Sequence, residues 1–167
     1  MFSKIRVIVV FFCLCILSGA AFIANAQPPE DPAAPILAPI YGPPITLAQA
    51  KLMAVAVNEA AGRNREQAMV IAITDPTGEL VYFEKMDGAA YMWIQLTQRK
   101  AVMAARYRFA SGTLPSTGAV GMPDAVSLEG GLPIVYQGQT IGAIGISGSE
   151  FGDVAYAELA IDVLNRR

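Results

Sequence analysis

The stretch MVIAITDPTGELVYFEKM, from Met69 to Met86, decides the fold of this chain. Two runs rich in apolar residues, Met69–Thr74 and Leu80–Met86, flank the tetrapeptide Asp75-Pro76-Thr77-Gly78. Proline suits the second position of a tight turn, and glycine takes the left-handed conformation that closes it. The stretch therefore predicts two antiparallel strands joined as a hairpin.

A helix is predicted before this hairpin. The hydroxyl of Thr46 and the amide of Gln49, three residues later, form a capping-box pattern, and Gly62 is a plausible helix stop. Helical spacing predicts which residues face the core. The expected buried residues are Leu52, Val55, Ala56 and Ala60, with Glu59 at the edge.

The rest of the chain predicts two more helices and a second hairpin. Helices are expected from Tyr91 to about Phe109 and over residues 152–164, and glycine- and proline-punctuated loops over residues 111–127. Strands at Pro133–Tyr136 and Thr140–Ser147 form the second hairpin. The order helix, hairpin, helix, loops, hairpin, helix predicts an α+β fold, with an antiparallel sheet built from two hairpins and covered by helices.

The N-terminal region has the pattern of an export signal. A positive start, the apolar run Val7 to Leu17 and the small residues Ala24-Asn25-Ala26 predict a signal peptide at 1–26, cleaved after Ala26. Residues 27–44 hold seven prolines and predict a stiff linker, followed by one domain at 45–167. We therefore expect a periplasmic or extracellular protein with no membrane span after cleavage.

Composition excludes several kinds of chemistry. The chain has no histidine, and both cysteines, Cys13 and Cys15, lie in the predicted signal peptide. A Ser-His-Asp triad, a cysteine nucleophile and an ordinary zinc site are therefore excluded from the mature domain. The formal net charge is −2, so nothing indicates the concentrated positive surface that nucleic acid requires.

Four side chains are candidates for a small-ligand site. Asp87 could bind a ligand or only form a turn before Gly88, and the neighbouring Met86 could be a ligand or a core filler. Thr97 and Lys100 lie one turn apart and share a helix face. For these two, the ordinary alternatives are a hydroxyl bonded to the preceding turn and a solvated lysine. Ala101 and Ala104 beside them would leave room for a flat ligand.

Glycines are concentrated around the second hairpin. Gly130 and Gly131 precede its first strand, and Gly142, Gly145 and Gly148 punctuate its second strand and the exit from it. Because glycine weakens a strand, this repeated use indicates close approach by a helix, by another chain or by a ligand. The spacing is not that of a dinucleotide-binding fingerprint.

Several of these motifs, in this order, resemble the GlcG/HbpS family, also called the haem-degrading or DUF336 domain. They are ITLAQA at residues 45–50, ITDPTGEL at 73–80, FEKMDGA at 83–89, GGLPI at 130–134 and IGAIGISG at 141–148. The resemblance implies an α+β domain that forms homo-oligomers and, in some members, binds haem. It also implies a helix threonine as iron ligand, for which Thr97 has the best-fitting position.

The leading hypothesis is therefore an exported haem- or tetrapyrrole-binding protein that sequesters haem or slowly degrades it. Lys100, or Arg99 and Arg106 on the same helix, would pair with the propionates, and Gly130-Gly131 would border the site. The alternative is an oligomeric accessory module that binds a small organic anion or a partner enzyme. A third hypothesis is an enzyme with Asp87 and Lys100 as its acid–base pair.

Overall fold

A computed structural model describes residues 38–65, 68–113, 121–150 and 152–166. The predicted signal peptide and the linker residues 27–37 lie outside the described residues. Within the described ranges, no helix is long and apolar enough to cross a membrane.

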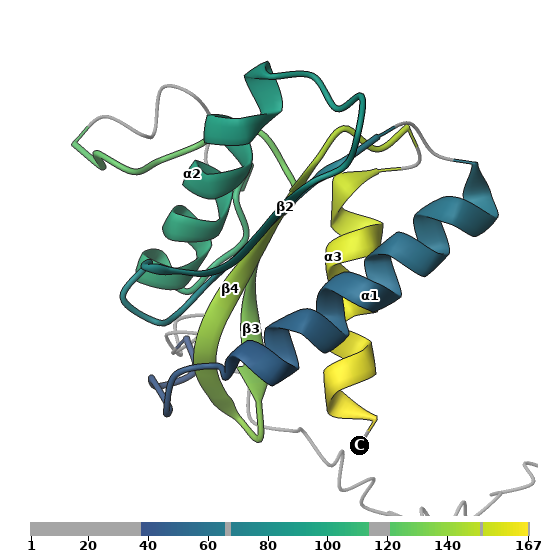
Figure 1. Cartoon of the computed structure of the whole chain (residues 1–167). Helices are drawn as coiled ribbons and strands as arrows, with labels where there is room; N and C mark the ends of the chain where they lie inside the picture. Colours follow the sequence, from purple (N-terminus) through teal and green to yellow (C-terminus); the bar gives the residue numbers. More distant parts are fainter. Residues whose placement is uncertain (1–37, 66–67, 114–120, 151, 167) are drawn as a thin grey trace, which may run out of the picture. The chain divides into compact units, whose positions relative to one another are not determined.

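In the part of the chain that the structure describes, three helices and four strands follow one another in the predicted order (Figure 1). They are α1 (Leu47–Asn64), β1 (Val70–Thr74), β2 (Leu80–Lys85), α2 (Met92–Tyr107), β3 (Gly131–Tyr136), β4 (Gln139–Ser147) and α3 (Asp153–Asn165). β1 pairs with β2 and β3 pairs with β4, both antiparallel, so the two predicted hairpins and the α+β class are confirmed.

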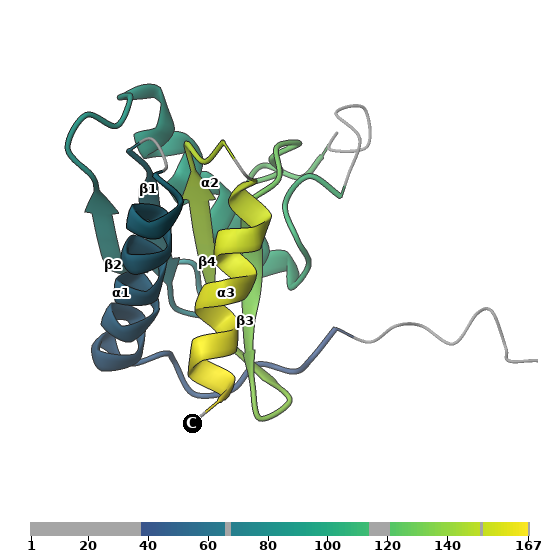
Figure 2. The same ribbon diagram turned by 90° about the vertical axis from the view of Figure 1, so that its right-hand side faces the viewer.

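The two hairpins join through their inner strands into one sheet with the order β2-β1-β4-β3. β1 and β4 run antiparallel, with Val70 opposite Ser147 and Thr74 opposite Ala143. α1 and α3 cover one face of this sheet, and α2 covers the other (Figures 1 and 2). The main core lies under α1 and α3, where isoleucines of β1 and β4 pack against both helices.

The capping box of α1 is confirmed, but the helix end and the buried face differ from the prediction. α1 passes through Gly62 and ends at Asn64, and Arg65 then takes the left-handed conformation with φ 54°. Val55, expected in the core, is 51% exposed. The buried residues are Ala50, Met53, Ala54, Val57, Ala60 and Ala61. An alanine-rich helix offers several apolar stripes, so periodicity alone does not identify the one that packs.

α2 lies unusually close to the sheet because glycines face its backbone. A Cβ atom at Gly145 would lie 2.3 Å from the carbonyl oxygen of Thr97, and one at Gly131 would lie 2.4 Å from that of Lys100. The glycine pattern allowed close approach by a helix, by another chain or by a ligand. At Gly145 and Gly131 the approaching partner is the helix α2. Ala101 and Ala104 are fully buried in the α2 contact with the sheet, so they do not leave room for a flat ligand there.

The described residues before α1 lie along the edge of the second hairpin. The amide of Thr140 donates to the carbonyl of Ile40 at 2.8 Å, and the amide of Gly42 donates back to the carbonyl of Thr140 at 2.9 Å. The hydroxyl of Tyr41 bonds to the carbonyls of Ala105 and Arg106 at 3.1 and 2.8 Å. These carbonyls belong to the last turn of α2 and have no partner within the helix. Residues 38–44, predicted as part of the linker, therefore help to hold the fold.

We expect Gly145→Ala to lower the free energy of unfolding by about 3 kcal/mol, because the added methyl meets helix backbone that cannot move aside. The matched control is Gly62→Ala, where a Cβ atom meets nothing within 4 Å. Since alanine favours a helix, this control should gain ~1 kcal/mol. Urea unfolding of both variants measures the difference. Equal stabilities would contradict the close helix–sheet contact.

Candidate functional site

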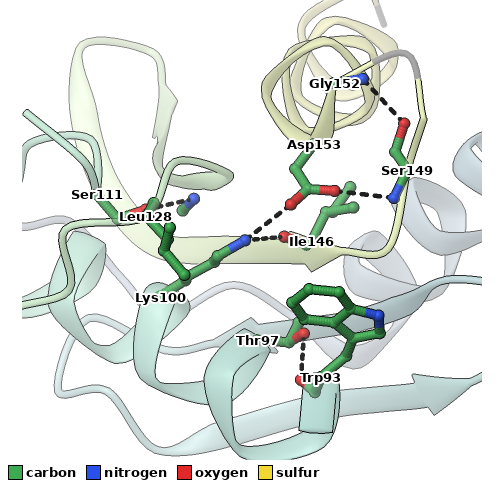
Figure 3. A network of polar contacts seen from close by, with 10 residues as sticks. Trp93, Thr97, Lys100, Ser111, Leu128, Ile146, Ser149, Gly152 and Asp153 are labelled. Carbon is green, nitrogen blue, oxygen red and sulfur yellow. Dashed lines mark hydrogen bonds and ion pairs between the residues drawn. The ribbon is translucent and has the colours of Figure 1, made fainter. Parts of the chain in front are cut away.

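Lys100 is the most deeply buried charged side chain among the described residues, at 2% exposure. Its Nζ donates to Asp153 Oδ2 at 2.8 Å and to the carbonyl of Ile146 at 2.9 Å (Figure 3). The lysine comes from α2, the carbonyl from β4 and the carboxylate from the first turn of α3. This ion pair therefore joins three elements, and the solvated-lysine alternative is wrong.

The loop between β4 and α3 orients the carboxylate. Asp153 Oδ1 accepts a hydrogen bond from the amide of Ser149 at 3.1 Å, and the amide of Gly152 donates to Ser149 Oγ at 3.0 Å. Gly130 packs directly over the pair. With φ 107°, a Cβ atom there would lie 2.5 Å from the Cβ of Asp153 and 3.1 Å from Lys100 Nζ. Only glycine therefore fits against the ion pair at this position. That Gly130 borders a ligand site stays a prediction.

A cavity of about 480 Å³ lies beside the ion pair. Its lining includes Trp93, Lys100, Leu128, Glu129, Ser149 and Asp153. The volume falls in the range of small-molecule sites. An ammonium group has three donors, and only two of those of Lys100 are used by described residues. The cavity can therefore offer a ligand carboxylate the third donor of an ammonium group whose charge is paired with Asp153, and a flat apolar ligand the surfaces of Trp93 and Leu128.

Thr97 is fully buried, and its Oγ1 donates to the carbonyl of Trp93 at 2.6 Å (Figure 3). The alternative of a hydroxyl bonded to the preceding turn is therefore confirmed. Thr97 does not line the cavity beside Lys100. Its role as an iron ligand stays a prediction, and the hydroxyl would have to exchange its bond to Trp93 for one to iron.

Met86 and Asp87 lie in a different place from Lys100. They line a second cavity, of about 490 Å³, together with residues of α1. Met86 Sδ also accepts a hydrogen bond from the amide of Met69 at 3.3 Å. The amide of Ala89 bonds to the carbonyl of Met86 at 3.1 Å and Gly88 has φ 85°, which confirms the predicted turn. Because the two cavities share no lining residue, the hypothesis that Asp87 borders one pocket with Lys100 is wrong.

The two arginines expected near the propionates also differ in position. Arg99 is exposed on α2, whereas Lys100 beside it is buried. Arg106 pairs with Asp124 at 2.8 Å and donates to the carbonyl of Thr77 at 2.9 Å. The hydrogen bond to Asp124 raises the pKa of the Arg106 guanidinium. Neither arginine lines the cavity beside Lys100.

Sequence reasoning missed the residues that complete this cavity. Asp153 was not singled out, although an acidic residue in the first turn of a helix was a usable signal. Trp93 falls within the helix predicted from Tyr91 to about Phe109 and carries no further signal, and Leu128 and Glu129 follow the region predicted as loops. No spacing rule connects these residues to Lys100, because they meet only after the sheet has formed.

The fold and the site define a small α+β binding domain, with helices on both faces of an antiparallel sheet and a buried cation beside a cavity. The sequence profile of the family described as "Haem degrading protein HbpS-like" matches residues 45–162. The chain belongs to this HbpS-like family.

Known relatives agree with this membership. Protein GlcG of Escherichia coli strain K12 is 32% identical over 99 residues, which cover 56% of this chain and 74% of the relative. An uncharacterised 15.0 kDa protein of Citrobacter freundii, from the dhaT-dhaS intergenic region, is 35% identical over 132 residues, 71% of this chain and 90% of that protein.

Solved structures show the same fold. Protein ORFY of Klebsiella pneumoniae has a TM-score of 0.66 at 27% identity, over 74% of this chain and 92% of that one. A double mutant of HbpS from Streptomyces reticuli has a TM-score of 0.65 at 26% identity, over 74% and 88%. A structure described as a PduOC:heme complex has a TM-score of 0.64 at 23% identity, over 73% and 96%. The last likeness shows the fold alone.

The buried ion pair predicts an asymmetry between its two partners. Asp153→Ala leaves the Lys100 ammonium buried and uncompensated, so it should lower the free energy of unfolding by about 4 kcal/mol. Lys100→Met should cost less, because methionine fills the space and Asp153 keeps its bond to Ser149. Urea unfolding of both single variants and the double variant measures this. A double variant that costs the sum of the singles would contradict a direct pair.

Proposed function

We propose that this domain binds a haem-type tetrapyrrole in the cavity beside Lys100. The observation that carries the proposal is the buried ammonium of Lys100, at 2% exposure, on a cavity with an aromatic and an aliphatic wall. A tetrapyrrole combines carboxylates with a wide apolar ring, and these are the two groups that the cavity can hold. Membership of the HbpS-like family, described as haem degrading, supports this ligand class.

The lining residues fit the organic part of haem better than its iron. Lys100 would hold a propionate, and Trp93 and Leu128 would contact the ring. The chain has no histidine, and its two cysteines lie outside the described residues, so the cavity offers neither imidazole nor thiolate. Binding should therefore depend on the carboxylates and the ring, with weak iron ligation.

We assign this site to sequestration or slow degradation of the tetrapyrrole by an exported homo-oligomer. The pattern of residues 1–26 supports export. Oligomer formation rests on the family resemblance. Haem bound without a strong protein ligand stays open to peroxide, so breakdown on this protein needs no dedicated acid–base pair.

A second candidate function uses the same cation. A small organic anion would pair with Lys100 without needing the aromatic wall, which suits an accessory module. The two functions differ in their dependence on the apolar side of the cavity, and Leu128 tests that side directly.

We expect Leu128→Asp to weaken haemin binding at least tenfold, because it removes an apolar contact and adds a charge that repels propionates. Leu128 is 54% exposed, so the change should cost little stability. The matched control is Leu80→Asp, on edge strand β2 at 48% exposure, which should bind as the parent does. Titration followed at the Soret band measures both. Absence of saturable haemin binding by the parent protein would overturn the proposed function.

Metal-free protoporphyrin IX tests the role of iron. We expect it to bind within about tenfold of haemin, and Thr97→Val to change neither affinity by more than about twofold. Valine has nearly the shape of threonine, so the core should stay packed. If Thr97→Val selectively lost haemin while keeping protoporphyrin, Thr97 would be the iron ligand that the family resemblance implies.

A further inference from the structure

The second cavity, between α1 and β2, has a polar lining that tetrapyrrole binding does not use. Its volume is about 490 Å³. Its lining includes Asn58, Gly62, Arg65, Glu84, Met86 and Asp87. None of them lines the cavity beside Lys100, so a ligand here would bind independently.

A chain of hydrogen bonds fixes the carboxylate of Glu84 in this cavity. Asn58 Nδ2 donates to Glu84 Oε1 at 2.7 Å, and the hydroxyl of Tyr82 donates to Glu84 Oε2 at 2.5 Å. The bond to Glu84 raises the pKa of Tyr82 to about 12. Tyr82 therefore stays protonated at neutral pH and keeps donating, so the carboxylate is held from both sides.

One buried acceptor in this network has no donor among the described residues. Asn58 Oδ1 is buried and makes no hydrogen bond with any of them. Its amide cannot be turned around to solve this, because Nδ2 is the atom that donates to Glu84. A buried carbonyl without a donor costs on the order of 1–3 kcal/mol, so a ligand that brings an N–H group would gain from reaching it.

The charges around this acceptor define the ligand. Glu84 and Asp87 supply two carboxylates, which together with Asn58 Oδ1 offer three acceptors to the three donors of an ammonium group. Arg65, the C-cap residue of α1, supplies a guanidinium that can pair with a carboxylate. Met86 and the open space beside Gly62 suit an apolar side chain.

We propose that this second cavity binds a free α-amino acid with an apolar side chain. The ammonium group lies among Asn58, Glu84 and Asp87, and the α-carboxylate pairs with Arg65. This site is separate from the Lys100 cavity and does not depend on tetrapyrrole binding.

Three matched probes test the assignment by isothermal titration calorimetry on the purified protein. They are L-leucine, isopentylamine, which lacks its carboxylate, and 4-methylpentanoate, which lacks its ammonium. L-leucine should bind saturably, isopentylamine at least tenfold more weakly, and 4-methylpentanoate not measurably. No binding of L-leucine, or equal binding of either partial probe, would overturn the amino-acid assignment.

Two variants locate the site without removing a buried group. Gly62→Leu fills the open space beside α1 and should abolish L-leucine binding while the helix is retained. Arg65→Gly removes the guanidinium at a left-handed position, φ 54°, that glycine adopts readily. The affinity of the Arg65→Gly variant for L-leucine should fall to the affinity of the parent protein for isopentylamine.

The control variant is Leu128→Asp, which changes the other cavity and should bind L-leucine as the parent does. Conversely, Gly62→Leu should leave haemin binding unchanged, so failure of one site is distinguishable from failure of the other. L-leucine binding that survives Gly62→Leu and Arg65→Gly would overturn the location.

Discussion

The buried ammonium of Lys100 is the constraint on which much of the structure depends. A charge removed from water is stable only when it is paired and hydrogen-bonded. Here both partners, Ile146 and Asp153, come from a segment that lies 46 to 53 positions after Lys100 in the sequence. Asp153 must therefore begin α3 close to the end of β4, and the carbonyl of Ile146 must point at the amine. The same requirement explains the two glycines at the start of β3. A side chain at Gly130 would collide with the ion pair, and one at Gly131 would collide with the backbone of α2.

The two faces of the sheet are packed by different means. Under α1 and α3, isoleucine and methionine side chains interlock in a conventional core. Under α2, small residues meet glycines, and the backbone of the helix comes close to the backbone of the sheet. The second arrangement leaves little room for adjustment, so it holds Trp93 and Lys100 in fixed positions at the first cavity. A rigid helix is a suitable wall for the rigid tetrapyrrole that we propose as the ligand.

Elements defined by neighbouring residues were predictable from the sequence. The Asp75-Pro76-Thr77-Gly78 turn and the Thr46–Gln49 capping box depend on residues within one turn of each other, and both are confirmed. The glycine pattern correctly indicated a close approach but could not name α2 as the partner. The Lys100–Asp153 pair could not be predicted, because no periodicity distinguishes a buried lysine from a solvated one. For the same reason, Asp87 was grouped with Lys100, although the fold places them in separate cavities.

The centre of the sheet also has a consequence for how the chain acquires its structure. β1 belongs to the first hairpin and β4 to the second, and their pairing sets Val70 against Ser147. Each hairpin forms locally, but the sheet closes only when segments far apart in the chain meet, after nearly all of the domain is available. Such non-local pairing slows folding relative to proteins built from local contacts. A nascent chain that lacks β4 would hold the first hairpin with the inner edge of β1 open, so the second hairpin controls when the first becomes stable.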